Sequence, residues 1–281
     1  MWTDENRKLY DRKGCRYPSD MTDFEWSLIE PLIPPGKRHG RHRSVNLREV
    51  FNAILYLLST GCQWRALPKD FPPRSTVNEY FKLWEWDGTL ERIHHELFVQ
   101  VRELAGKKAS PTAAIIDSQS VKAAEKGGAE IDEIGYDAGK KVKGIKRHIV
   151  VDTLGMILGA MIQPASTQDR DGALPVLAEV RRLFPFIKKI FADGGYQGAA
   201  TACAVAALGQ WELEIVKRSD TAKGFVVLPK RWIVERTFGW IGRCRRLSKH
   251  FENLSKNALA FLRLAMIRLM TRRIARLALQ Q

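Results

Sequence analysis

Cysteine is scarce in this chain of 281 residues, and its positions exclude the commonest cysteine-based frameworks. The four cysteines form no Cys-x-x-Cys pair and have no histidine nearby at zinc-finger spacing; they are Cys15, Cys62, Cys203 and Cys244. Neither a disulfide scaffold nor a structural zinc site is therefore expected. We predict ordinary thiols in a reducing compartment.

Long apolar runs are also missing. No stretch reaches the roughly eighteen apolar residues that a membrane span requires. The N-terminus, Met-Trp-Thr-Asp-Glu-Asn-Arg-Lys, has no apolar core of a secretory signal. Internal repeats and low-complexity tracts are absent as well. We expect a soluble, intracellular protein with no membrane partner.

Acidic residues are few relative to basic ones. Lys and Arg total 46 against 31 Asp and Glu, which gives a net charge of +15 and a pI near 9.8. This excess favours a polyanionic partner, most commonly nucleic acid, although a basic protein that merely stays soluble is the alternative. The hydrophobic content of 45% is ample for a packed core, so a wholly disordered chain is excluded.

The pattern of residues 22–106 is typical of a small helical domain. Thr22 and Glu25 form a capping box, and further helices are expected at 47–59, around 64–67 and from Ser75. This order is compatible with a helix-turn-helix DNA reader, although a structural or dimerisation module would look the same. In a DNA reader, the exposed early face of the last helix would carry Arg74, Ser75, Thr76, Asn78 and Lys82.

A basic segment, residues 37–43, interrupts these helices. It is expected either to lie extended along phosphate or to form a solvated loop. The sequence does not separate these two interpretations.

From Ala113 onward, short apolar runs replace the helical pattern. Strands are expected at 113–117, 148–152, 156–160, 189–192 and 212–216, and helices at 171–184, 199–208, after Pro229 and at 256–277. A three-stranded meander that leads into alternating strands and helices is the arrangement of the ribonuclease H-like α/β fold. We therefore predict an all-α, helix-turn-helix-like domain at residues 1–106. A ribonuclease H-like mixed-sheet catalytic domain with the C-terminal helix is predicted at residues 107–281.

Three acidic residues stand where their side chains can converge. Asp117 and Asp193 each follow a short apolar strand, and parallel strands of one sheet place their ends side by side. Glu235 is expected on a helix, at the margin of its buried face and one turn from Arg231. Carboxylates in this arrangement can hold two divalent ions roughly 3.5–4 Å apart, which activate an oxygen nucleophile and neutralise the leaving oxygen in phosphodiester chemistry.

Each of these acids also has a structural interpretation. An Asp before Gly is frequent in turns and caps, and a Glu four residues from an Arg on a helix is usually a surface pair. Only the joint placement of the three acids favours a metal site. Other candidate acids are interpreted as turn, loop or helix-cap residues; these are Asp132, Asp137, Asp152, Asp169 and Asp171.

Basic residues flank the proposed acid site on both sides in the sequence. A glycine- and lysine-rich segment precedes the second strand, and arginines lie on or after the helix of Glu235. A carboxylate centre approaches a polyanion only with compensating cations, so these side chains are candidate DNA contacts, whereas a solvated charge run is the alternative. The candidates are Lys140, Lys141, Lys143, Lys146, Arg236, Arg243 and Arg246.

Five motifs carry a resemblance to a known family. They are Trp64-Arg65-Ala66-Leu67-Pro68, Ile115-Ile116-Asp117-Ser118, Gly135-Tyr136-Asp137-Ala138-Gly139-Lys140-Lys141, Asp193-Gly194-Gly195-Tyr196-Gln197-Gly198 and Arg231-Trp232-Ile233-Val234-Glu235-Arg236-Thr237-Phe238-Gly239-Trp240. With them the chain resembles DDE-type insertion-sequence transposases of the IS-four/IS-five group, from Met21 to the C-terminal helix.

The resemblance implies that Asp117, Asp193 and Glu235 are the first, second and third metal-binding acids. Arg231 matches the arginine of the family's Tyr-Arg-Glu-Lys signature, which is expected to contact phosphate near the transposon end. The chain departs from that signature at Leu228 and Gly242, where the tyrosine and the lysine would stand. Arg243 or Arg246 is a candidate substitute for the lysine.

We therefore expect a transposase that uses two Mg²⁺ ions, with Mn²⁺ able to replace them. It would bind terminal inverted repeats, nick the 3′ ends and join each 3′-OH to target DNA. It would act as a homodimer or higher oligomer on double-stranded DNA, in the bacterial cytoplasm at the nucleoid. The alternatives are a structure-selective ribonuclease H-like nuclease and an inactivated transposase that only binds DNA.

Overall fold

The computed structural model describes Thr3, Arg7 and residues 10–36, 42–125, 130–216 and 230–278. Contacts divide the chain into two compact units. Among the described residues, unit 1 holds those up to Lys107, Cys244–Leu247 and those from Ala260 onward, and unit 2 holds Lys108–Arg243 and Ser248–Leu259. Most of the C-terminal helix thus counts with the N-terminal helices. Whether residues 1–106 and 107–281 are separate folding domains stays a prediction.

Unit 1 contains short helices with clear sequence signals at their ends. The predicted capping box is confirmed, because the Thr22 hydroxyl accepts from the Glu25 N–H and the Glu25 carboxylate accepts from the Thr22 N–H. Asn46 caps the next helix, which ends at Gly61 in the left-handed region (φ 70°). The helices are α2 (Asp23–Ile29), η1 (Glu30–Leu32), α3 (Leu47–Thr60), η2 (Trp64–Ala66), α4 (Arg74–Trp86) and α5 (Thr89–Leu104).

The core of unit 1 is aromatic. Phe51 lies against Trp84 with ring centroids 5.7 Å apart, and Phe81 stacks on Phe261 of the C-terminal helix at 4.7 Å. All four side chains are buried. Large rings of this kind contribute most of the apolar area that stabilises a small helical unit.

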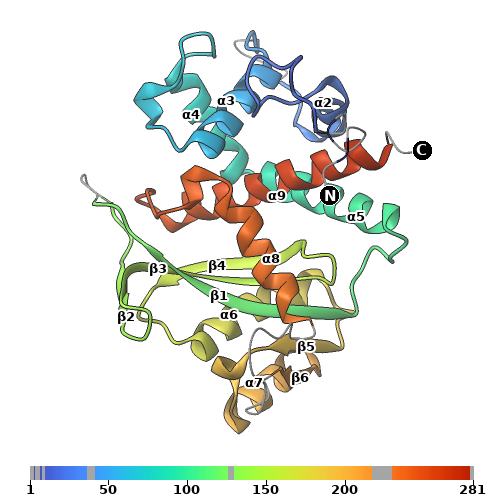
Figure 1. Ribbon diagram of the computed structural model, residues 1–281, viewed down its shortest axis with the longest axis vertical. Helices are drawn as coiled ribbons and strands as arrows, with labels where there is room; N and C mark the ends of the chain where they lie inside the picture. The colour runs from blue at the N-terminus through green and yellow to red at the C-terminus, as the bar shows by residue number, and fades with distance from the viewer. Residues whose placement is uncertain are drawn as a thin grey trace. The chain divides into compact units, whose positions relative to one another are not determined.

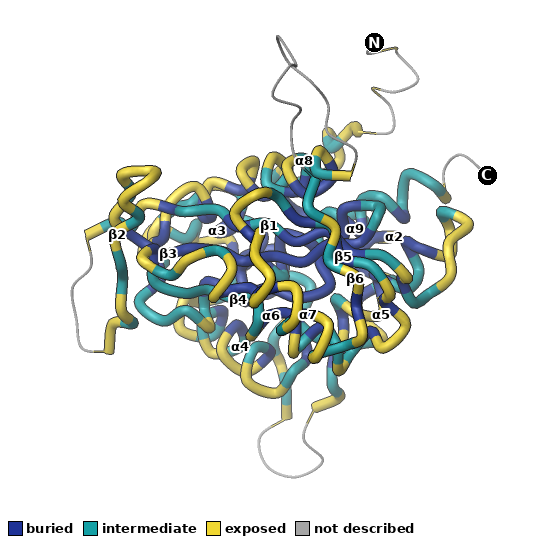
Figure 2. Tube along the Cα trace, turned by 90° about the horizontal axis from the view of Figure 1, so that it is seen from below, coloured by how far each residue is buried: buried dark blue, intermediate teal, exposed yellow. Residues whose placement is uncertain are grey.

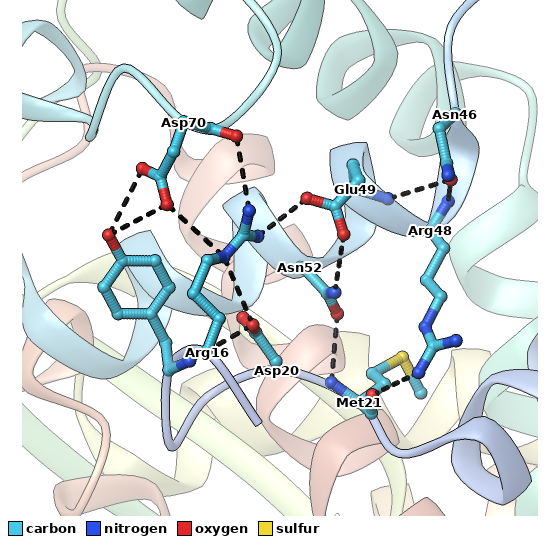
Figure 3. Close-up of polar contacts among 9 residues, drawn as sticks. Arg16, Asp20, Met21, Asn46, Arg48, Glu49, Asn52 and Asp70 are labelled. Carbon is cyan, nitrogen blue, oxygen red and sulfur yellow. Dashed lines mark hydrogen bonds and ion pairs between the residues drawn. The ribbon is translucent and has the colours of Figure 1, made fainter. Parts of the chain in front are cut away.

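A polar network fastens the segment before α2 to α3 (Figure 3). Arg16 forms ion pairs with Glu49 at 2.7 Å, Asp70 at 3.4 Å and Asp20 at 3.6 Å. The Asn52 amide oxygen accepts from the Met21 N–H at 3.0 Å. Residues without regular secondary structure are thereby given fixed partners.

Unit 2 is built on one mixed sheet (Figure 1). Strand β3 pairs antiparallel with β1 and with β4, whereas β5 and β6 run parallel to β1 on its other side. Three antiparallel strands followed by parallel strands beyond the first are the ribonuclease H-like topology, so this prediction is confirmed. The strands are β1 (Ala113–Lys122), β2 (Gly135–Asp137), β3 (Val142–Val151), β4 (Ile157–Pro164), β5 (Lys189–Ala192) and β6 (Glu212–Ile215).

Two strands are longer than the sequence predicted. β1 does not end at Asp117 but continues to Lys122, and β3 begins at Val142 rather than at His148. The cause is tertiary pairing, because the polar second half of β1 forms its ladder with the first half of β3, up to Lys122 opposite Gly144. The short strand β2 on β3 was not predicted.

Helices cover the sheet and define its two faces. Val180 of α6 fits against Gly159 of β4, where a methyl group would lie 2.5 Å from Cγ2, and Figure 1 shows α8 crossing β1. β3 is buried over most of its length, whereas β1 is buried mainly in its apolar first half (Figure 2). The helices of unit 2 are α6 (Asp169–Leu183), η3 (Gly194–Tyr196), α7 (Ala199–Gly209) and α8 (Arg231–Gly242). Of the two that follow, η4 (Arg245–Leu247) belongs to unit 1, and α9 (Ser255–Ala278) begins in unit 2 and lies mostly in unit 1.

The longest of these helices, α9, carries arginines along most of its length. None of the helices in the described ranges is long and apolar enough to cross a membrane.

Candidate active site

The first two candidate acids lie on neighbouring strands of unit 2. β1 and β5 pair in parallel, with Ala113 opposite Lys189 and Ile115 opposite Phe191. Two residues further on, the same register sets Asp117 beside Asp193, whose backbone is still extended directly after β5. The topology thus brings two carboxylates together at one place in the sheet.

Arg231 connects the third acid to this pair. It is the first residue of α8, and its Nη2 lies 3.6 Å from Asp193 Oδ2 and 3.5 Å from Glu235 Oε1. Both distances exceed those of a charge-assisted hydrogen bond, which are about 2.7–2.9 Å. The three acids and Arg231 therefore form one site in which the ion pairs are loose.

Burial and charge act together on Asp117. Burial raises the pKa of Asp117 to about 6, and the negative charge of Asp193 raises it too, whereas the Ser118 N–H, Arg231 and Lys140 lower it. The Ser118 N–H donates to Asp117 Oδ1 at 2.7 Å. A nearby cation would stabilise the ionised form of a carboxyl group in such surroundings.

The turn between β3 and β4 fixes α8 and with it Glu235. Thr237 Oγ1 donates to the Gly155 carbonyl at 2.8 Å, and Arg236 Nη2 donates to the Leu154 carbonyl at 2.9 Å. A methyl group at Gly155 (φ 84°) would lie 2.9 Å from Thr237 Oγ1, so glycine permits the close approach. Asp152 accepts from two backbone N–H groups of this turn, so its interpretation as a turn residue is confirmed.

Arg236 is held in place by aromatic rings as well. Its guanidinium lies 4.5 Å from the Trp232 ring centroid and 4.6 Å from that of Trp240. The two rings lie one turn of α8 before and after Arg236. Together with the bond to Leu154 they fix the position of the guanidinium.

Asp169 is the acid whose place the sequence did not reveal. Its interpretation as a helix cap is wrong, because Gln168 is the N-cap of α6 and makes no side-chain cap bond. Asp169 Oδ1 instead accepts from Ser118 Oγ at 2.7 Å and from Lys146 Nζ at 2.8 Å. Although burial alone would raise it, the pKa of Asp169 is lowered by these two hydrogen bonds. The signal in the sequence was weak, because Asp193 directly follows β5 whereas Asp169 is separated from the end of β4 at Pro164.

Two of the candidate DNA contacts lie inside the protein. Lys146 is buried and donates to the Thr167 carbonyl at 2.7 Å and to Asp169, with Asp137 at 3.7 Å. Arg246 lies in η4 of unit 1, buried, and donates to the Cys62 carbonyl at 2.9 Å. The reason is the same for both: the side chain neutralises or caps groups of the protein itself and does not reach solvent.

The remaining candidates reach the surface to different degrees. Arg231, Arg236 and Asn78 are partly exposed, and Lys140, Lys141, Lys143, Arg243 and Arg74 are exposed. Only Lys140 and Lys141 lie in the turn before β3, because Lys143 is a residue of that strand. Lys140 also lowers the pKa of Asp117 and of Asp169, so its charge acts at the acid site. Arg74 and Asn78 belong to unit 1, where α4 carries them.

The donor chemistry fits a divalent cation. Carboxylate oxygens are hard ligands, and Mg²⁺ keeps several waters and uses only one or two carboxylates of the protein. Asp117 and Asp193 supply such a pair by their register. Within the part of the chain that the structure describes, no group of three or more Asp, Glu, His or Cys side chains is gathered around one point.

Three sequence features fall outside the described residues. They are the departure from the signature at Leu228, Pro229 before α8, and the first part of the basic segment, residues 37–41. The other departure, Gly242, is the last residue of α8.

Family comparisons agree for both halves of the chain. Residues 108–270 match the family described as "Transposase DDE domain". Residues 21–94 match the family described as "Putative transposase of IS4/5 family". The first match spans the sheet, α8 and most of α9, and so includes all three candidate acids.

Two curated relatives come from Burkholderia cepacia. An uncharacterized 16.2 kDa protein of insertion element IS402 is 34% identical over 107 residues, which are 36% of this chain and 71% of that protein. The putative transposase for insertion sequence element IS402 is 34% identical over 128 residues, 43% of this chain and 60% of that protein. The match thus spans less than two thirds of that second relative.

Solved structures show more distant similarity. The Drosophila P element transposase in its strand transfer complex has a TM-score of 0.34 and 14% identity, over 70% of this chain and 45% of that one. A pre-cleavage Mos1 transpososome has a TM-score of 0.31 and 11% identity, over 87% and 81%. TM-scores this low do not assign a family. The DDE-domain match does, because it covers more than half of the chain. The protein therefore belongs to the transposase DDE-domain family.

Proposed function

We propose that this protein is a transposase that cuts DNA at the ends of an insertion element and joins those ends to a target. The observation that carries the proposal is the register of β1 and β5, which sets Asp117 beside Asp193. Arg231 then links Asp193 to Glu235. Two acids on neighbouring strands and one on a helix have the composition that metal-dependent phosphodiester chemistry requires.

In this proposal the three acids hold two Mg²⁺ ions, for which Mn²⁺ can substitute. When bound, the ions supply an activated oxygen nucleophile and neutralise the leaving oxygen. Asp117 and Asp193 would hold the ions from the sheet, and Glu235 would complete their ligands from α8. Arg231 neutralises a phosphate oxygen, which its position between two carboxylates allows.

The reaction takes place in two steps, cleavage and joining. In cleavage, a water oxygen bonds to phosphorus, the bond from phosphorus to the 3′ oxygen breaks, and that oxygen takes up a proton. The products are a 3′-OH and a 5′-phosphate. In joining, the 3′ oxygen bonds to a target phosphorus and a target 3′ oxygen leaves with the proton, so no external energy source is needed.

DNA would be held by side chains of both units that reach the surface. In unit 2 these are the exposed Lys140, Lys141, Lys143 and Arg243 and the partly exposed Arg236, and in unit 1 α4 would present Arg74 and the neutral Asn78 to a groove. Two DNA ends must be processed together, so we propose a homodimer or higher oligomer on DNA, acting at the bacterial nucleoid.

The test is cleavage and joining of a supercoiled plasmid that carries the element's ends, with Mg²⁺. Asp117→Ala and Glu235→Ala should each reduce cleavage by about a hundredfold or more, because each removes charge stabilisation at the reacting phosphate. Asp171→Ala, which changes an exposed acid at the start of α6, is the control and should cleave as the wild type does. Persistent activity in either of the first two variants would overturn the proposal.

The same assay separates the alternatives. A nuclease without transposase activity would give cleaved plasmid but no product in which an element end is joined to target DNA. A protein that only binds DNA would give neither product while retaining end binding.

A further inference from the structure

Asp169 lies close to the acid site but belongs to no part of the proposed triad. Its Oδ1 is fixed from two strands, by Ser118 Oγ of β1 and Lys146 Nζ of β3. The Lys146 ammonium has further partners in the Thr167 carbonyl and Asp137, so it is locked in place. One oxygen of Asp169 is therefore immobilised by the same strand that carries Asp117.

The second oxygen of Asp169 lies near Asp193. A methyl group added at Gly195 would lie 3.0 Å from Asp193 Oδ1 and 3.3 Å from Asp169 Oδ2, so the two oxygens are no farther apart than the sum of these distances. The Gly195 N–H donates to Asp193 Oδ1 at 2.8 Å, whereas among the described residues no hydrogen bond reaches Asp169 Oδ2. A quarter of the Asp169 side chain is exposed. A cation or its waters next to Asp169 Oδ2 would relieve the repulsion between the two carboxylates.

A buried hydroxyl group marks the same place. Tyr196 is 1% exposed, and in the described part of the chain its Oη has no hydrogen-bond partner. Burial raises the pKa of Tyr196 well above its usual range, and the charges of Asp117, Asp169 and Asp193 raise it as well. The Ser118 hydroxyl lies near enough to lower this pKa in part, but the Tyr196 hydroxyl keeps its proton and can donate a hydrogen bond to a water or a carboxylate oxygen nearby.

We propose that Asp169 is a fourth carboxylate of the site, a positioning residue whose Oδ2 accepts hydrogen bonds from the waters of the cation held by Asp117 and Asp193. This inference rests on the proposed function. Mg²⁺ keeps several of its waters, so a carboxylate set one water away from the ion acts through them. Ser118 and Lys146 hold Oδ1 so that Oδ2 faces this shell.

Calorimetric titration of the full chain with Mn²⁺ and with Mg²⁺, without DNA, tests this role apart from catalysis. Asp169→Asn keeps the volume of the side chain and should weaken binding about tenfold, the lower end of what loss of such an outer partner costs. Asp137→Asn is the matched control, because it removes the other acid that contacts Lys146 but lies on β2, where its oxygens accept from Ser120 and the Lys140 N–H. Its binding should change less than about twofold.

Asp117→Asn in the same titration separates failure of this inference from failure of the proposed function. If Asp117→Asn abolishes binding and Asp169→Asn binds as the wild type does, Asp169 is only a structural residue and the inference is overturned alone. If Asp117→Asn also binds normally, both are overturned.

Ser118→Ala is a second variant for the case in which Asp169→Asn does not fold, which thermal melting would reveal. It keeps the charge of Asp169 and frees only Oδ1, so binding should weaken about two- to threefold. Unchanged binding in Ser118→Ala would overturn the role given to the anchored carboxylate.

Discussion

Two arginines of this chain each lie among carboxylates, one in each unit, and they do so in different ways. Arg16 of unit 1 meets Glu49 at 2.7 Å (Figure 3). It also lies 4.3 Å from the centroid of the Phe71 ring. Arg231 of unit 2 comes no closer than 3.5 Å to Glu235, and its Nε is buried without a partner among the described residues. The first arrangement is closed and the second is open.

The difference separates charges that hold the fold from charges that are available to a ligand. In a closed network every charged group already has a partner within the protein, so a ligand would add little stabilisation to it. An open set of carboxylates is held together against its own repulsion, and a ligand cation relieves that repulsion. Unit 2 contains both kinds, because Lys146 closes a contact with Asp137 and with one oxygen of Asp169, next to the open carboxylates of Asp117 and Asp193.

The largest effect is expected at the closed cluster of unit 2. Lys146→Met keeps the stem of the side chain but leaves Asp169 and Asp137 without their shared cation. We expect the free energy of unfolding at pH 7 to fall by about 3 kcal/mol, measured by urea denaturation. Both carboxyls have a lowered pKa in the fold, so this contribution should be present above pH 4 and disappear as the pH falls through the folded pKa values.

Lys143→Met serves as the control for that loss. Lys143 lies on the same strand but is exposed, so its replacement should change stability by less than about 0.5 kcal/mol. An equal fall in the free energy of unfolding in the two variants would mean that the buried contacts of Lys146 do not stabilise the fold. It would contradict the distinction between closed and open charges.

A smaller effect of opposite sign is expected at Asp117. Burial raises its pKa from 3.8 to about 6, so between these values the folded protein binds more protons than the unfolded chain. Stability should therefore fall as the pH rises from 4 to 6, and Asp117→Asn, which cannot ionise, should be more stable at pH 7 by about 2 kcal/mol. Denaturation curves of both proteins at pH 4, 5, 6 and 7 measure this difference.

Asp171→Asn provides the comparison, because the side chain of Asp171 is exposed and should show no such trend. If Asp117→Asn were less stable than the wild type at every pH, Asp117 would be a structural acid. Gain of stability together with loss of cleavage is the result that marks an acid kept for function.

Local patterns in the sequence were enough for much of this fold. The capping box at Thr22, the strand before Asp193 and, apart from the short β2, the order of strands and helices depend on neighbours in the chain, and the structure has them. The second half of β1 was missed because Ser118 and Ser120 break the apolar pattern. Those residues are extended only because β3 pairs with them.

The candidate site shows the same limit. Asp117 and Asp193 could be predicted to meet, since parallel strands align their ends. The partners of Lys146 and Arg246 could not be predicted, because a lysine or arginine in a basic run looks exposed until the acids or carbonyls that bury it are known. Asp169 was missed for the same reason, since its partners come from β1 and β3, 51 and 23 residues away.

The smallest effect on stability is expected at Arg231, and it is the sharpest test of the comparison. Arg231→Gln breaks two ion pairs of 3.5 and 3.6 Å and should change the free energy of unfolding by less than about 0.5 kcal/mol. Arg16→Gln, which breaks closed contacts, should cost about 1–2 kcal/mol. DNA binding should show the reverse order: binding to element ends should weaken in Arg231→Gln, with the slope of log affinity against log salt smaller by about one, and stay unchanged in Arg16→Gln. A large loss of stability in Arg231→Gln with an unchanged salt slope would contradict this comparison. It would show that Arg231 and the acids it contacts stabilise the fold and do not bind DNA.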